Sequence, residues 1–414
     1  MSWFRRITLV LSLSSLLVFG LALGMNWIQG PGLENLAGEV KSSDLFQHYG
    51  AGVFVENGQA VDLYQGGKLG IWIRHQHKPG TDFNSSSFNY VYPPFLAWTA
   101  SHLVFTGYPA FALIWLGLSV LFYLICISQL GTFWGRREML FPSLLLLGLP
   151  SLHYSLILGQ NSCLSFLIIC SSALLLHRQR TIAAGLVLSC LFYKPQFLPL
   201  LAGFMFIQGH FRFVLAAAAG SLLWLITGLL VCGPASYGDW LQVLQNLSSG
   251  GQLQFAELNQ TVKMFVLNLL GQSAHPGKIT GPLTTFLGLG LLGLAAFSVR
   301  LARPGKKWSA AHSLLLASAV MTVTSPYLMH YDLLLAAGWW CLCLLENENQ
   351  GWQNKALAAT FWMVSLFSIN TANWPAPATA PIMLLYLFFT MRNALVPSVR
   401  DSDGKSRNSV PVPT

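Results

Sequence analysis

Apolar segments long enough to cross a lipid bilayer recur from one end of the chain to the other. A transmembrane helix needs about 20 mostly apolar residues to cross a hydrocarbon core of about 30 Å. The pattern therefore predicts an all-α polytopic membrane protein with about 11–12 transmembrane helices. We expect one integral-membrane domain over residues 1–395 and a disordered cytoplasmic tail over residues 396–414. The predicted spans are Ile7–Trp27, Pro94–Phe105, Pro109–Leu130, Met139–Leu156, Cys163–Leu176, Ile182–Ile207, Phe213–Cys232, Pro282–Ala302, Ala310–Tyr327, Leu333–Leu345, Ala356–Ile369 and Ala378–Thr390.

The polar segments between the spans predict the topology. Two are long, residues 29–92 and residues 233–280, whereas the basic residues gather at the start of the chain, in short loops and in the tail. Because Lys and Arg favour the cytoplasmic side, we expect both termini in the cytoplasm and both long loops outside, in the cell inner (plasma) membrane. Strict alternation would place two basic loops outside. A juxtamembrane segment 94–105 and a re-entrant turn at residues 194–196 would remove that conflict.

Composition narrows the classes of partner. Hydrophobic residues make up 54% of the chain and charged residues 9%, against about 25% charged in soluble domains. The net charge of +9 is scattered over segment ends, which indicates membrane lipids rather than nucleic acid as partners. The seven cysteines lie in apolar runs and suggest neither a disulfide framework nor a metal site. We expect no cofactor and no metal, since the outer loops contain no paired Asp-x-Asp motif.

Asp44 is the first candidate for chemistry. Most of the 14 acidic residues fall in segments predicted to lie outside, so a membrane enzyme using an acid or base would work on the outer face. Asp44 opens a run with apolar residues at helical spacing, which predicts an interfacial helix lying on the membrane. The apolar positions are Leu45, Phe46, Tyr49, Val53 and Phe54. An N-cap at Ser42, Ser43 or Asp44 explains the same residues equally well.

Further polar residues interrupt apolar segments, where they must face a cavity, water or another helix. Gln160 and Asn161 break one apolar run, and Lys194 breaks another at a depth that indicates either a function or a snorkelling side chain. Tyr92 precedes two prolines that suit a first helical turn and make it a rim residue. Asn259 and Gln260 close the second long loop. His330 and Asp332 stand at a helix mouth, where a proton-transfer pair or a phosphate contact would need them, although an ordinary interfacial histidine would look the same.

Taken in order, these motifs resemble glycosyltransferase family 87, the polyprenol-phosphate-mannose-dependent mannosyltransferases of the GT-C class. The similarity extends from about residue 7 to residue 390 and rests on the order and spacing of the motifs. The resemblance implies a GT-C-type bundle with a catalytic first extracytoplasmic loop. It also implies transfer of a hexose, by analogy mannose, from a polyprenyl-phosphate donor to a lipid or glycan acceptor.

The resemblance also assigns roles to residues. Asp44 matches the loop aspartate that acts as general base, and a single displacement then inverts the anomeric carbon. His330 and Asp332 match a polar mouth near the donor, with Lys194 and His330 as the first groups to face the leaving phosphate. The chain departs from the family pattern at Phe46–His48, where an aliphatic and aromatic run is commoner. This departure bears on the identity of the acceptor.

Two other classes of function remain open on the sequence alone. A secondary transporter would use Lys194 and Asp332 as coupling or substrate sites in broken helices, but the chain shows no paired halves. A transporter should keep its function when Asp44 is changed, whereas the enzyme should not. A non-catalytic membrane scaffold would leave the amide and lysine interruptions of apolar spans without a use.

Overall fold

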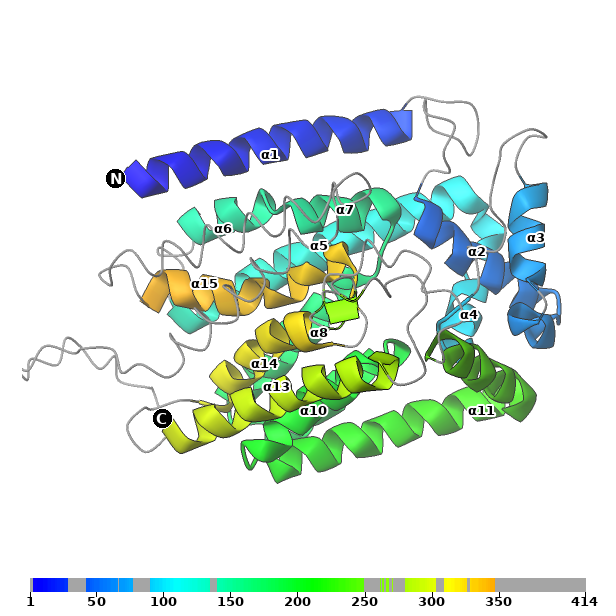
Figure 1. Cartoon of the computed structure of the whole chain (residues 1–414). Coiled ribbons are helices and arrows are strands. Elements are labelled where there is room, and N and C mark those ends of the chain that lie inside the picture. Colours follow the sequence, from blue (N-terminus) through cyan, green and yellow to red (C-terminus); the bar gives the residue numbers. More distant parts are fainter. Residues whose placement is uncertain are drawn as a thin grey trace, which may run out of the picture.

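The described part of the chain is helical in the computed structural model (Figure 1). The structure describes residues 3–28, 42–65, 67–76, 90–134, 140–248, 261, 263, 266–267, 270, 280–302, 309–325 and 328–346. Four of its helices are long and apolar enough to cross a membrane: α1 (Trp3–Ile28), α5 (Tyr108–Trp134), α11 (Phe211–Ser248) and α13 (Thr280–Ala302). A fifth span forms if α6 (Leu140–Leu147) and α7 (Pro150–Leu158), bent by 42°, are one broken helix. The polytopic all-α class predicted from the sequence is thus confirmed.

Shorter helices fill the interior between these spans. They are α8 (Ser162–His177), α9 (Thr181–Ser189), η4 (Cys190–Tyr193), α10 (Phe197–Ile207), α14 (Ala310–Thr324), η7 (His330–Ala336) and α15 (Ala337–Glu346). Helix α8 packs against α5, α9 and α14, and nearly every side chain of α14 is buried. Large apolar side chains on α11 and α13, such as Leu230 and Phe286, are instead exposed. This division is typical of inner helices packed on protein and outer helices facing lipid.

A group of short helices covers one end of the bundle (Figure 1). It comprises α2 (Ser43–Glu56), η1 (Ala60–Tyr64), α3 (Lys68–His75), α4 (Pro94–Ser101) and η3 (Val104–Thr106). Gly52 lets α2 approach the backbone of α4, because a Cβ there would lie 2.9 Å from the carbonyl carbon of Ala100. Leu45, Phe46 and Phe54 are buried among these helices. The expectation that α2 lies on the membrane by its apolar face is therefore wrong, since protein covers that face.

Several predicted spans are divided or extended in the structure. The segment 94–105 forms only α4 and η3, and the eight residues of α4 reach about 12 Å, which fits the juxtamembrane alternative. The segment 182–207 is broken at Lys194, because a residue before proline disfavours helical backbone. Helix α11 continues through a kink at Gly233, φ 79°, so that residues 234–248, expected in the second outer loop, are helical. Residues 356–369 and 378–390, the tail 396–414 and most of residues 249–279 lie outside the described residues.

Cysteine labelling can test the predicted topology. We expect a cysteine in place of Ser86 to react with a membrane-impermeant reagent in intact spheroplasts, and one in place of Lys306 to react only after lysis. The physical reason is the positive-inside bias of the basic loops. Protection at Ser86→Cys together with labelling at Lys306→Cys would reverse the orientation.

Candidate active site

Asp44 lies in the first turn of α2 and does not serve as its N-cap. Ser42 occupies the N-cap position, in a left-handed conformation (φ 53°) and without a side-chain cap bond. Tyr108 of α5 fixes this start by donating from its hydroxyl to the Ser42 carbonyl oxygen at 3.0 Å. The Asp44 carboxylate instead accepts a hydrogen bond at Oδ2 from Nε2 of Gln160. The cap interpretation of Asp44 is thus excluded, and its carboxylate joins the site.

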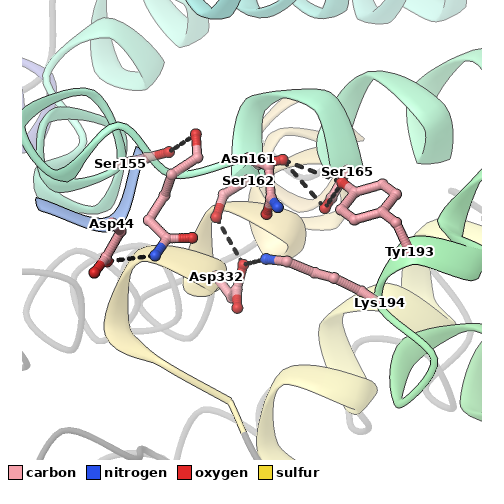
Figure 2. Close-up of polar contacts among 9 residues, drawn as sticks. Asp44, Ser155, Asn161, Ser162, Ser165, Tyr193, Lys194 and Asp332 are labelled. Carbon is pink, nitrogen blue, oxygen red and sulfur yellow. Dashed lines mark hydrogen bonds and ion pairs between the residues drawn. The ribbon is translucent and has the colours of Figure 1, made fainter. Parts of the chain in front are cut away.

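The turn between α7 and α8 carries Gln160, Asn161 and Ser162 into the interior. Figure 2 shows Asn161 and Ser162 there. It starts at Gly159, which adopts a left-handed φ of 70°. A Cβ at Gly159 would also lie 2.5 Å from Cβ of Leu45 on α2. Glycine is needed there on both counts. Its absence of a side chain lets α2 approach closely enough for Gln160 to reach Asp44.

Two hydroxyl groups hold this turn in place. Tyr193 donates from Oη to the Asn161 carbonyl oxygen at 3.2 Å, and Ser165 donates to the same oxygen at 3.3 Å. The two hydroxyls also contact each other at 2.6 Å. Since all three groups are buried, the backbone position of Asn161 is fixed by α8 and η4 together.

Lys194 and Asp332 form a buried ion pair at the centre of the site (Figure 2). Lys194 Nζ lies 2.6 Å from Asp332 Oδ1, and the side chains are only 3% and 5% exposed. Ser162 Oγ donates to the same oxygen at 2.7 Å. The ammonium group also lies over the rings of Phe197, at 5.3 Å, and Tyr331, at 5.7 Å. Lys194 therefore does not snorkel to the membrane surface, because its charge is neutralised inside the protein.

His330 occupies the same region but does not pair with Asp332. Its ring packs edge-on against Tyr154 and Tyr331, with centroids 4.8 Å and 5.2 Å away. Neither ring nitrogen has a hydrogen-bond partner among the described residues. The expected His330–Asp332 proton-transfer pair is thus not formed, since Asp332 binds Lys194 instead.

Tyr92 and His48 pack against each other. The Tyr92 carbonyl oxygen accepts a 2.6 Å hydrogen bond from Tyr64 Oη, and the Tyr92 ring lies 4.6 Å from that of His48. The Nδ1 atom of His48 is 3.3 Å from Tyr90 Oη. His48 was not predicted as a site residue. The signal was present, because residues four apart on a helix, such as Asp44 and His48, share one face.

Electrostatics link the two sides of this arrangement. Burial raises the pKa of Asp44 to about 6, although the Gln160 hydrogen bond and the charge of Lys194 both act to lower it. Burial, reinforced by the charge of Lys194, lowers the pKa of His48 to about 3, so His48 is neutral at physiological pH. Gln160 bonds Asp44 and Ser162 bonds Asp332, so one turn connects α2 with the Lys194–Asp332 pair.

The remaining predicted site residues, Asn259 and Gln260, lie outside the described residues. Within the described ranges, no group of three or more His, Cys, Asp or Glu side chains could hold a metal ion. The structure brings together one carboxylate of raised pKa, a buried ion pair, two amides and two histidines. Five predicted positions along the chain therefore meet in space: Asp44, Tyr92, the Gln160–Asn161 turn, Lys194 and the His330–Asp332 segment.

Comparison with known proteins adds a family assignment. The model of glycosyltransferase family 87 matches residues 90–326, which is more than half of the chain. The matched segment includes Tyr92, Gln160, Asn161 and Lys194, whereas Asp44 precedes it and His330 and Asp332 follow it. No curated protein and no solved structure matches the chain.

Proposed function

Because the chain belongs to glycosyltransferase family 87 and is a multi-pass membrane glycosyltransferase, we propose that its donor is a polyprenyl-phosphate hexose, by analogy mannose. The acceptor is a lipid or glycan, and the transfer takes place at the extracytoplasmic face of the cell inner membrane. The reaction inverts the anomeric carbon. The polyprenyl-phosphate sugar is a substrate, and no cofactor or metal takes part.

Asp44 carries this proposal. A general base works best when its pKa lies near the working pH, and the raised pKa of about 6 brings Asp44 toward that range. The acceptor hydroxyl gives its proton to Asp44 as its oxygen bonds to the anomeric carbon. The bond from that carbon to the phosphate oxygen breaks, and its electron pair leaves with the polyprenyl phosphate. One attack from the opposite face inverts the configuration.

The donor side of the site is built around Lys194 and His330. A leaving phosphate needs positive charge or hydrogen-bond donors nearby, and Lys194 supplies the charge among the described site residues. In the present structure this charge is held by Asp332, so an arriving phosphate competes with Asp332 for Lys194. The other proposed donor- and acceptor-binding residues are Tyr92, Gln160, Asn161, Asn259 and Gln260.

Transfer can be tested with purified protein in lipid nanodiscs. Radiolabelled polyprenyl-phosphate mannose is the donor, and a membrane lipid extract supplies the acceptor. We expect labelled product and free polyprenyl phosphate. In a separate experiment, mass spectrometry of lipids and glycans from cells with and without the protein identifies the natural product. Movement of intact donor across a vesicle bilayer, unaffected by Asp44→Asn and without product, would instead indicate a transporter.

The pH profile offers a second test. The ionised carboxylate is the active base, so kcat/KM should be constant above about pH 6 and fall as the pH drops through about 6. The slope of the acid limb should approach a tenfold loss per pH unit. Gln160→Leu removes a hydrogen bond that favours the charged form, and its acid limb should therefore move to higher pH. Asp44 would be excluded as the titrating group if kcat/KM of the variant fell at the same pH as that of the wild type. It would also be excluded if kcat/KM of the wild type did not fall near pH 6.

A further inference from the structure

Three buried polar atoms without a hydrogen-bond partner among the described residues lie in the α7–α8 turn. Asn161 is 2% exposed, and within the described residues neither its Nδ2 nor its Oδ1 has a hydrogen-bond partner. Gln160 is 4% exposed, and its Oε1 is likewise unpartnered there. Buried polar groups in native proteins are nearly always hydrogen-bonded, and an exception calls for an explanation. A bound ligand that supplies the missing bonds is such an explanation.

The position of Asn161 along the turn indicates which part of a ligand it meets. The preceding residue, Gln160, bonds Asp44, and the following residue, Ser162, bonds Asp332 in its pair with Lys194. In the proposed reaction the base and the leaving phosphate stand on opposite sides of the anomeric carbon. Asn161 is thus flanked by residues that contact each side. In Figure 2 its amide extends from the turn toward the side on which Lys194 and Asp332 meet.

The chemistry of the amide also selects among ligand groups. An amide offers a donor and an acceptor side by side, and a sugar hydroxyl both donates and accepts. A phosphate oxygen only accepts, so it would leave Oδ1 of Asn161 and Oε1 of Gln160 unpaired. An isoprenoid chain offers no polar atom at all. Hydroxyl groups are therefore the ligand atoms that satisfy every unpartnered atom of the turn.

Resting on the proposed function, we infer that Asn161 determines sugar specificity by hydrogen-bonding a hydroxyl pair of the hexose on the donor, with Gln160 Oε1 accepting from a neighbouring hydroxyl. Tyr193 and Ser165 donate hydrogen bonds to the Asn161 carbonyl oxygen. These bonds fix the backbone that carries the Asn161 side-chain amide before the donor binds. Such preorganisation lowers the entropic cost of binding.

Deoxygenated donors test this inference. Kinetics are measured with polyprenyl-phosphate mannose and with derivatives in which hydrogen replaces one hydroxyl at a time. For the wild type, loss of a hydroxyl that Asn161 contacts should lower kcat/KM by roughly tenfold to a hundredfold, because buried amide atoms are then left unpaired. In Asn161→Leu the same derivative should be used within a factor of about two of the full donor, since the two changes remove one interaction.

The unfolding temperature of the donor-free protein distinguishes a role of Asn161 in binding from a role in folding. The Asn161 amide has no partner among the described residues, so Asn161→Leu should leave the unfolding temperature of the donor-free protein unchanged or higher. Asn161→Ala, which only removes atoms, serves if leucine does not fit. Ser172→Ala is the matched control, because Ser172 is also buried and unpartnered in the described structure but lies roughly three turns along α8. It should keep wild-type discrimination among the donors.

These experiments distinguish a failure of the Asn161 inference from a failure of the proposed sugar transfer. Wild-type discrimination retained in Asn161→Leu and Asn161→Ala overturns the inference and leaves the proposed function intact. A change confined to the acceptor KM overturns it as well, because the amide would then bind the acceptor. Failure of the wild type to transfer sugar from any of these donors sinks the proposed function itself.

Discussion

Replacing Asp44 by Asn should lower the rate of sugar transfer by about 10²–10⁴-fold, the usual contribution of a general base. The change removes one charge and almost no volume. Its amide oxygen can still accept the hydrogen bond from Gln160 Nε2 that Asp44 accepts now. Folding and donor binding should therefore stay close to wild type, and the loss should fall on kcat rather than on the donor KM. The measurement is steady-state transfer in nanodiscs at a pH well above 6.

Asp62→Asn is the matched control for this result. Asp62 lies in the same group of short helices and pairs with Lys68 at 2.5 Å on the protein surface. Its substitution removes the same charge from the same end of the bundle but should leave transfer unchanged. If Asp44→Asn inserts normally and transfers sugar at a near-native rate, the catalytic assignment of Asp44 is lost.

The fold class, and the burial of several residues of the candidate site, were predictable from sequence for one physical reason. A polar residue inside an apolar span is too costly to face lipid, so it must face a cavity or a partner. This reasoning picked out Gln160, Asn161 and Lys194, and all three side chains are buried in the structure. The start of α4 at Pro93 and Pro94 and the break at Lys194 were also predictable, because proline restricts both its own backbone and that of the preceding residue.

Other features depend on three-dimensional packing and left no local signal. Lys194 and Asp332 are 138 positions apart, so the sequence does not indicate that they form an ion pair. The neighbouring residues His330 and Asp332 were an equally plausible pair. The apolar face of α2 has the same pattern whether lipid or protein covers it, so hydropathy could not reveal its burial against α4. The length of a span is similarly ambiguous, since buried helices such as α14 and lipid-facing ones are both apolar.

Removing Lys194 should destabilise the protein and weaken donor binding together. Lys194→Met leaves the Asp332 carboxylate buried without its countercharge, and breaking a buried pair from one side costs about 3–5 kcal/mol in the free energy of unfolding. Ser162 Oγ, which also bonds Asp332 Oδ1 at 2.7 Å, cannot replace the charge. We expect a matching fall in unfolding temperature in detergent or nanodiscs. The donor KM should rise as well, because the leaving phosphate loses its cation.

A double variant separates the two effects of Lys194. Asp332→Asn in the Lys194→Met background removes the unpaired charge, so most of the stability should return while the donor KM stays high. Lys68→Met is the control for the stability measurement, because Lys68 and Asp62 form an ion pair on the surface, 48% and 32% exposed. This change should lower the free energy of unfolding by only about 0–1 kcal/mol. Recovery of donor binding along with stability in the double variant would show that Lys194 serves only to balance Asp332. Persistence of the donor defect in a stable protein would mean that the buried lysine is held in place for the phosphate.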